Sequence, residues 1–257
     1  MSVLTLRAIA RPCCSHARYF ATSSSSYPSD AYTKASSATS SPESINTTPS
    51  DLTESQREAL DSALRVDQAG EIAANYIYMG QMAVLGRDAK LKPLIQASSS
   101  MKDMWEQEKK HLVVMDKLQI QHRVRPTLLS DVAKVAGFGL GAATALMGKE
   151  AAMACTEAVE TVIGEHYDEL SPIRVKFVQE SRLIPDLKSQ LKELSQFSTQ
   201  HPSIPLLKEV ITEFRDDELE HLDIAVENHS QRAPAHALLS SVVGLGCKVA
   251  IELCKRI

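Results

Sequence analysis

The chain has 257 residues, of which 28 are Lys or Arg and 32 are Asp or Glu, giving a formal net charge of −4. This near balance provides no basic field and argues against a dedicated nucleic-acid-binding protein. Hydrophobic residues make up 44% of the chain and aromatic residues only 5%, and the many Ala, Leu, Glu and Lys residues favour helices. The five cysteines include no CxxC pair, so we expect a reducing compartment and no disulfide framework.

The first fifty residues differ in composition from the rest of the chain. Arg7, Arg11 and Arg18 precede the first acidic residue, and Ser, Thr, Ala and Pro dominate residues 21–50. A segment rich in Arg and Ser but poor in acids is typical of organelle transit peptides. We therefore predict that residues 1–50 are a mitochondrial transit peptide and a disordered Ser/Thr-rich linker. The alternative is a disordered tail with no targeting role.

The remaining chain, residues 51–257, is predicted to be one all-α domain. Thr53 and Gln56 are spaced as a capping box at the start of a helix over about 54–85. No stretch alternates with period two for long enough to predict a sheet. The other predicted elements are helices over about 89–121, 128–170 and 202–229, one from 234 to the C-terminus, and an extra segment over about 173–205.

Two of these helices contain long apolar stretches. Residues 135–148 and 233–247 carry almost no charge, and both are shorter than the roughly 20 residues that span a bilayer. One interpretation is that these helices lie in a membrane interface or line the mouth of an apolar substrate site. The other is that they are buried on all sides, with Gly and Ala allowing close approach. Composition favours neither, and neither interpretation predicts a transmembrane protein.

Two ExxH motifs are the first candidates for chemistry. Glu108 and His111 form one pair, and Glu218 and His221 form the other. This spacing places a carboxylate and an imidazole one helical turn apart on the same face, where both can bind one metal ion. Such pairs also arise by chance, so each alone is a weak signal and its histidine could be a surface residue.

The helix before each ExxH motif carries a glutamate among small or apolar residues. These are Glu71, in VDQAGEIAANY, and Glu160, in ACTEAVETVIG. The order Glu, ExxH, Glu, ExxH is the ligand set of ferritin-like four-helix bundles that hold two iron or manganese ions. We therefore predict six metal ligands from a duplicated helical pair. Other helical glutamates are expected to be solvated: Glu106, Glu157, Glu165, Glu213 and Glu220.

The sequence around these residues resembles the mitochondrial demethoxyubiquinone hydroxylase family of ubiquinone biosynthesis. The similarity covers nearly all of residues 65–255, including RVDQAGEIAANYIYMGQMAVLGRD, MWEQEKKHL and FRDDELEHLDIA. The resemblance implies a di-iron monooxygenase that uses O₂, electrons from NADH and a polyprenyl demethoxyquinone or quinol. It also implies peripheral attachment to the matrix face of the inner membrane and a lipid-binding partner protein. The implied iron ligands are Glu71, Glu108, His111, Glu160, Glu218 and His221.

Two departures from the family pattern stand out. Ile72-Ala73 follow the first glutamate where the family has Tyr-Gly, and the segment over about 182–205 is longer than in compact members. His166 and Tyr167 follow the second glutamate, and we expect them near the metals or at the point of electron entry.

Three other functions would use a similar bundle: iron storage or peroxide handling, quinol oxidation, and a non-enzymatic membrane scaffold. The apolar helices and the resemblance favour the hydroxylase.

Overall fold

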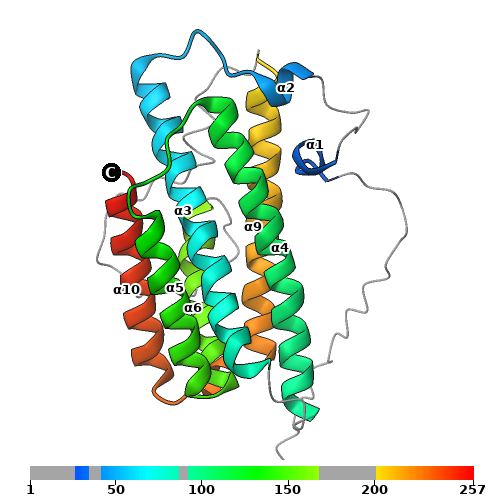
Figure 1. Cartoon of the computed structure of the whole chain (residues 1–257), viewed down its shortest axis with the longest axis vertical. Coiled ribbons are helices and arrows are strands. Elements are labelled where there is room, and N and C mark those ends of the chain that lie inside the picture. The colour runs from blue at the N-terminus through cyan, green and yellow to red at the C-terminus, as the bar shows by residue number, and fades with distance from the viewer. Residues whose placement is uncertain (1–26, 35–41, 87–91, 168–200) are drawn as a thin grey trace, which may run out of the picture.

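The computed structural model describes residues 27–34, 42–86, 92–167 and 201–257, and throughout these ranges the regular elements are helices. Four long helices form a bundle (Figure 1). The prediction of an all-α fold is confirmed. The bundle helices are α3 (Glu54–Leu85), α4 (Lys92–His122), α6 (Lys149–Tyr167) and α9 (Ser203–Glu227).

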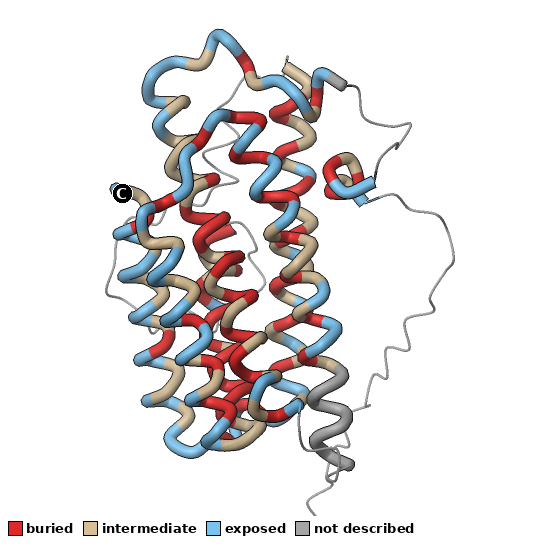
Figure 2. The backbone as a smooth tube through the Cα atoms, in the orientation of Figure 1, coloured by how far each residue is buried: buried red, intermediate tan, exposed pale blue. Residues whose placement is uncertain are grey.

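The start of α3 follows the predicted capping box. The Thr53 hydroxyl accepts a hydrogen bond from the Gln56 backbone N–H at 3.3 Å, and the Gln56 side chain accepts one from the Thr53 N–H at 3.0 Å. Two otherwise unpaired donors of the first turn are thereby satisfied. Further along, buried residues face the bundle interior (Figure 2), where Leu64 and Phe214 belong to one cluster and Tyr78 and Met153 to another.

The prediction of one helix over about 128–170 is wrong. The chain forms α5 (Ser130–Leu146) and then α6, separated by Met147 and Gly148. Gly148 has a φ of +120°, a conformation that favours glycine and that ends a right-handed helix. Because Gly148 ends a run that already contains three other glycines, sequence alone did not mark it as the turn.

Each half of the bundle ends in an apolar helix. After α3 and α4 comes α5, which packs along α3, and after α6 and α9 comes α10 (His236–Cys254), which packs along α6. A short 3₁₀ helix, η1 (Ser230–Arg232), precedes α10. Both apolar helices lie on the α3–α6 side of the bundle (Figure 1). The duplication predicted for two helical pairs therefore extends to a third helix in each half.

Glycines bring α5 against the backbone of α3. A Cβ atom added to Gly141 would lie 2.0 Å from the Ile77 carbonyl oxygen, and one added to Gly137 would lie 2.7 Å from that of Ala73. The opposite side of α5 is exposed, as is much of α10. The interpretation that α5 is buried on all sides is therefore wrong, because only one of its faces is close-packed. Its place in a membrane interface or at an apolar substrate site stays a prediction. We call the exposed large hydrophobic residues of these two helices, with Met147 directly after α5, the apolar face: Val132, Val135, Phe138, Leu146, Met147, Leu238, Val242, Leu245, Val249 and Leu253.

Helix α10 is longer than the apolar stretch seen in the sequence. It has 19 residues, an 18-residue window of it has a mean hydropathy of 1.7, and among the described helices it alone is long and apolar enough to cross a membrane. In the structure it lies against α6, where Lys248 pairs with Glu165 at 3.1 Å. Length and composition therefore leave α10 able to span a bilayer, whereas its packing makes it part of the bundle.

Two short helices also form before residue 51. Helices α1 (Asp30–Thr33) and α2 (Pro42–Asn46) contact α4 and α9, whereas we expected a disordered linker there. The difference arises from Tyr32, an aromatic residue in a polar tract, which is 5% exposed and packs in the same cluster as Leu118. Most of the predicted targeting signal and most of the extra segment over about 173–205 lie outside the described residues.

Candidate metal centre

The six residues predicted as metal ligands meet in the middle of the bundle. Glu71 comes from α3, the first ExxH pair from α4, Glu160 from α6 and the second ExxH pair from α9. All six are at most 3% exposed. Their possible ligand atoms form two groups, each with its atoms within 4.8 Å of one another. The groups are Glu71, Glu108, His111 and Glu218, and Glu108, Glu160, Glu218 and His221.

Glu108 and Glu218 belong to both groups and lie between the two histidines. The Nδ1 atom of His111 is 3.3 Å from one oxygen of Glu218, and the Nδ1 atom of His221 is 3.3 Å from the other. A Glu108 oxygen lies 3.1 Å from His221 Nδ1. Two shared carboxylates, with one further glutamate and one imidazole on each side, form the donor set for two neighbouring ions.

The polar atoms of this cluster fit bound cations. Each of the six residues has at least one buried side-chain atom without a hydrogen-bond partner, including both oxygens of Glu108. Leaving such atoms unpaired in a dry interior is costly, and metal coordination would satisfy them. The four carboxylates together carry four negative charges when ionised, which two divalent cations would balance.

Burial and mutual repulsion alter the acidity of the cluster. Burial, followed by the neighbouring carboxylates Glu108 and Glu218, raises the pKa of Glu71 and of Glu160 well above the ordinary value. Burial alone would also raise the pKa of Glu218, but the close approach of His111 and His221 lowers it below the ordinary value. In the metal-free cluster, the two outer glutamates therefore keep their protons to higher pH than Glu218 does.

Two residues missed by the sequence analysis orient the imidazoles. His111 Nε2 is 2.9 Å from an Asp217 oxygen, and His221 Nε2 is 2.8 Å from the Gln107 side-chain oxygen. Because both partners accept through oxygen, each Nε2 carries a proton, and Nδ1 is the nitrogen that would bind a cation once its own proton is displaced. Gln107 and Asp217 each directly precede the glutamate of an ExxH motif, but each pairs with the histidine of the other helix, a partner that local spacing does not reveal.

Tyrosines and an asparagine support the glutamates. The Tyr78 hydroxyl donates to Glu160 at 3.0 Å, and the Tyr167 hydroxyl donates to Glu71 at 3.4 Å. The Asn75 side chain donates to the backbone oxygens of Glu71 and Glu108, joining α3 to α4. Tyr167 was expected near the metals and does contact the cluster; its role in electron entry stays a prediction.

His166 belongs to neither of the two ligand groups and lies beside Asp67. It is 7% exposed, and its Nε2 atom lies 3.5 Å from Asp67, one helical turn before Glu71. Its proposed role at the point of electron entry also stays a prediction.

Among the glutamates expected to be solvated, Glu213 differs, because its side chain is only 6% exposed and pairs with Lys110 at 2.7 Å. The glutamate was misassigned because its covering residues come from the N-terminal segment.

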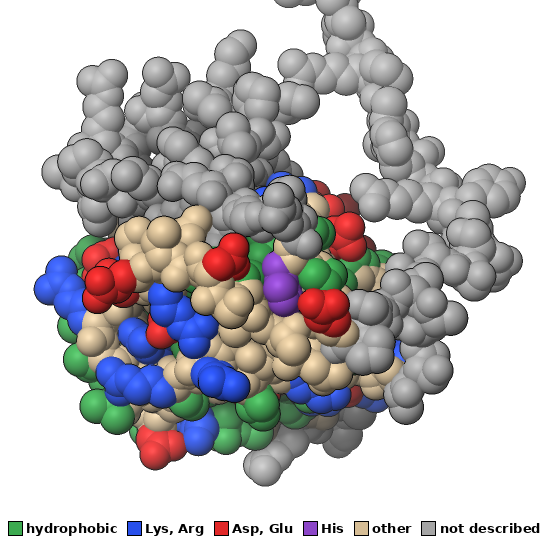
Figure 3. All heavy atoms as spheres, turned by 90° about the horizontal axis from the view of Figure 1, so that it is seen from above, with side chains coloured by type: hydrophobic (Ala, Val, Ile, Leu, Met, Phe, Trp, Pro, Cys, Tyr) green, Lys and Arg blue, Asp and Glu red, His purple; other side chains and the backbone are tan. Residues whose placement is uncertain are grey.

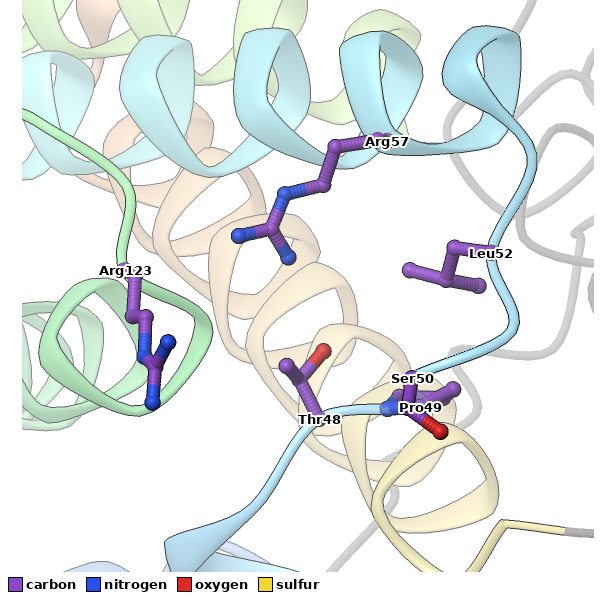
Figure 4. A pocket seen from close by; sticks show the side chains of 6 residues that line it. All are labelled: Thr48, Pro49, Ser50, Leu52, Arg57 and Arg123. Carbon is purple, nitrogen blue, oxygen red and sulfur yellow. The ribbon is translucent and has the colours of Figure 1, made fainter.

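A separate pocket of about 290 Å³ lies at one end of the bundle (Figure 4). Arg57 of α3 and Arg123 of the turn after α4 border it, together with residues of the segment before α3. Figure 3 shows Lys and Arg side chains gathered on this end of the molecule. Arg57 precedes Glu71 by fourteen residues, or about 21 Å of helix. This pocket is therefore distinct from the carboxylate cluster.

Comparison with known proteins identifies the family of this chain. Residues 58–254 match the family model described as "Ubiquinone biosynthesis protein COQ7". The NADPH-dependent 3-demethoxyubiquinone 3-hydroxylase, mitochondrial, of Bos taurus is 47% identical over 201 residues, covering 78% of this chain and 79% of the relative. The 5-demethoxyubiquinone hydroxylase, mitochondrial, of Saccharomyces cerevisiae is 42% identical over 209 residues, covering 80% and 82%. The 3-demethoxyubiquinol 3-hydroxylase of Rhodospirillum rubrum is 41% identical over 198 residues, covering 77% and 78%.

These findings confirm the resemblance seen in the sequence and the prediction of a hydroxylating enzyme. The names of the cattle and yeast relatives also agree with the predicted mitochondrial location. The electron source in the name of the cattle relative is NADPH, where the resemblance had implied NADH. The family match begins before Glu71 and ends after His221, so it contains all six residues of the cluster. The chain therefore belongs to the COQ7 family of ubiquinone biosynthesis proteins.

Proposed function

We propose that this protein hydroxylates the ring of a demethoxy-polyprenyl quinone or quinol during ubiquinone biosynthesis, with two iron ions as its cofactor. The convergence of six buried carboxylate and imidazole groups, each with an unpartnered atom, carries this proposal. The ions would be held by Glu71, Glu108, His111, Glu160, Glu218 and His221. Carboxylate oxygens with one imidazole per ion suit iron that changes oxidation state.

Two ferrous ions would supply the electrons and the Lewis acidity that O₂ reduction requires. The chain's own residues keep bulk water out, since all six ligands are buried, and they fix the direction of each ligand. Asp217 and Gln107 hold the imidazoles, and Tyr78 and Tyr167 hold one oxygen of each outer glutamate. Such support keeps a metal site in one geometry through a reaction cycle.

The overall reaction replaces one ring C–H by C–OH and releases the second oxygen atom as water. Two electrons and two protons are consumed for each O₂. We propose a reduced nicotinamide as their source, with NADH implied by the resemblance and NADPH present in the names of several relatives. Oxidation of a quinol to a quinone with reduction of O₂ to water, and iron handling, would use the same ligands, but neither adds an oxygen atom to the ring.

We further propose that the protein is attached to the matrix side of the inner mitochondrial membrane through the apolar face. Its ten residues are 39% to 77% exposed, although water disfavours contact with such side chains. Helices α5 and α10 pack on α3 and α6, which carry Glu71 and Glu160. A long isoprenoid tail could thus remain in the lipid while the ring enters the bundle. A lipid-binding partner protein at this surface is part of the same proposal.

Isotope labelling tests the reaction. The full chain is loaded anaerobically with ferrous iron and given a short-tailed demethoxyquinol, a reduced nicotinamide and ¹⁸O₂. The proposal predicts one ¹⁸O atom in the ring by mass spectrometry, and its loss in a Glu160→Gln variant. Consumption of O₂ without ring labelling would instead favour an oxidase or an iron-handling protein.

A further inference from the structure

The N-terminal segment contacts the helices that carry both ExxH motifs, although it lies outside the family match, which begins at residue 58. Helix α1 packs on α4, and α2 packs on α4 and α9 (Figure 1). We call residues 27–34 and 43–50 the N-terminal strap. Ser29 and Tyr32 in the strap are 0% and 5% exposed, so parts of the strap are as buried as the bundle core.

The first strap segment is anchored on Glu213 of α9. One oxygen of this carboxylate accepts a hydrogen bond from the Ser29 backbone N–H at 2.9 Å, and the other accepts one from the Ser29 hydroxyl at 2.6 Å. Lys110 of α4 also binds Glu213, at 2.7 Å, and its Nζ atom lies 4.9 Å from the centre of the Tyr27 ring. Glu213 therefore joins the strap, α4 and α9 at one point. Charge-assisted hydrogen bonds of this kind are stronger than neutral ones.

Both strap segments are also fixed to one glutamine near the end of α4. Gln121 accepts a hydrogen bond from the Tyr32 hydroxyl at 2.8 Å. Its amide nitrogen donates to the backbone oxygens of Ser44 at 3.1 Å and of Thr47 at 2.7 Å. The side chain of Gln121 thus uses both its oxygen and its nitrogen on the strap, which specifies how the strap lies on α4.

These anchors lie next to one half of the metal centre. Lys110 directly precedes His111, and Glu213 directly precedes Phe214. The rings of His111 and Phe214 stack with their centroids 3.9 Å apart. Helices α4 and α9 approach each other closely at few points, so the Lys110–Glu213 link is one of their connections. His221, the imidazole of the other half, has no such link to the strap among the contacts of the described residues.

We propose that the N-terminal strap is a retained part of the mature enzyme that braces α4 against α9 and positions His111, but not His221, for metal binding. Removal of a targeting sequence would accordingly end before Tyr27. The statement about metal binding rests on the proposed function, whereas the statement about bracing does not. Ser29, Tyr32 and Glu213 act as positioning residues because none of them touches the six-residue cluster.

The test uses the full chain with a Ser29→Ala/Tyr32→Ala double variant. The matched control is Lys34→Ala, whose side chain is 65% exposed and pairs only with Asp30 of the strap itself among the contacts described. Hydrogen exchange of backbone amides in residues 110–121 and 210–218 should be at least about tenfold faster in the double variant than in the control. In an anaerobic Co²⁺ titration, affinity for one of two ions should fall by about tenfold, with the other unchanged.

Equal exchange rates and equal Co²⁺ affinities in the double variant and the control would overturn the proposal. An equal loss at both ions would contradict the selective effect on His111. If the unaltered protein binds no Co²⁺, the proposed metal centre fails, while the exchange rates still decide whether the strap is a brace. Should the double variant not fold, Tyr32→Phe removes only the hydrogen bond to Gln121 and should shift exchange in the same direction.

Intact-mass measurement of the mature protein from mitochondria of its own source tests retention of the strap separately. The proposal predicts an N-terminus at or before Tyr27. A mature chain that begins after Tyr32 would lack the residues that contact Glu213 and Gln121, and would overturn the proposal.

Discussion

Tyr78 and Tyr167 lie at equivalent positions of the two halves of the bundle, and each donates a hydrogen bond to the buried glutamate of the other half. Tyr78 follows Glu71 by seven residues and binds Glu160, and Tyr167 follows Glu160 by seven residues and binds Glu71. Seven residues are about two helical turns, so each tyrosine shares a face with its own glutamate. The site is therefore built by two similar halves whose supporting hydrogen bonds cross between them.

Replacing Glu160 by glutamine should abolish hydroxylation without unfolding the protein. The change removes one carboxylate ligand, and activity should fall by more than about 100-fold, beyond the usual effect of residues that only support a ligand. The melting temperature of the metal-free protein should be unchanged or higher, because a buried ionisable group becomes neutral. Glu165→Gln, on the outer side of the same helix, is the control and should retain activity. Full activity of Glu160→Gln would remove this residue from the metal site.

The two histidines are supported unequally, and metal affinity should reveal it. Asp217 holds His111 through a carboxylate, whereas Gln107 holds His221 through an amide. Asp217→Asn should therefore weaken binding of one ion by about 10- to 100-fold, as measured by anaerobic Co²⁺ titration. Asp216→Asn is the matched control, since Asp216 is 63% exposed and pairs with Arg215. An equal effect of both substitutions would argue against a specific role for Asp217.

Metal uptake should strengthen as the pH rises. Burial and the neighbouring carboxylates raise the pKa of Glu71 and Glu160. Burial alone would lower the pKa of His111, but Asp217 and Glu218 raise it to about 9. A raised pKa means that each group keeps its proton to higher pH, and a cation must displace that proton. Affinity should therefore increase between about pH 6 and pH 8, with proton release measurable in weakly buffered solution. Binding without proton release would contradict these assignments.

Charges on the apolar face should release the protein from lipid. Val135 and Leu245 are 77% and 62% exposed, so Val135→Asp and Leu245→Asp change no buried contact. Each substitution should lower binding to liposomes by about tenfold or more, because burial of one such side chain contributes about 1.5–3 kcal/mol. Ile120→Asp is the control, since Ile120 is 78% exposed on α4, outside the apolar face. Unchanged binding of the first two variants in a flotation assay would argue against this surface.

Two glycines of α5 should respond oppositely to substitution. At Gly141 a Cβ atom would lie 2.0 Å from the Ile77 carbonyl oxygen, whereas at Gly139 it would meet nothing within 4 Å. Gly141→Ala should lower the free energy of unfolding by about 1–3 kcal/mol through overpacking. Gly139→Ala should raise it by about 0.5–1 kcal/mol, because alanine loses less backbone entropy in a helix. Denaturant unfolding curves measure both, and equal effects would contradict the close α3–α5 contact.

The six-residue cluster could be predicted from sequence because helical geometry converts spacing into position. An interval of three residues brings Glu108 and His111 to one face, and the same holds for the second ExxH pair. Repetition of Glu and ExxH in each half then matched one known architecture. The prediction of a four-helix bundle depended on the same periodicity, and the structure confirms it.

Features that depend on contacts between distant segments were harder to predict from the sequence. The turn at Met147 and Gly148 is hidden in a run of glycines and alanines, and the φ of +120° that marks it is seen only in the structure. Glu213 reads as a solvated helical glutamate until Ser29, 184 residues earlier in the chain, is placed against it. The roles of Gln107 and Asp217 required knowing which helices face each other. Local periodicity carries no information on such partners.

Iron stoichiometry tests the two-ion centre most directly. The full chain is titrated anaerobically with ⁵⁷Fe²⁺ and analysed by Mössbauer spectroscopy, with the Glu160→Gln variant measured in parallel. Two tightly bound ferrous ions per chain, with at least one lost in the variant, are the predicted result. Binding of a single ion, or of none, by the unaltered chain would contradict a centre built from Glu71, Glu108, His111, Glu160, Glu218 and His221.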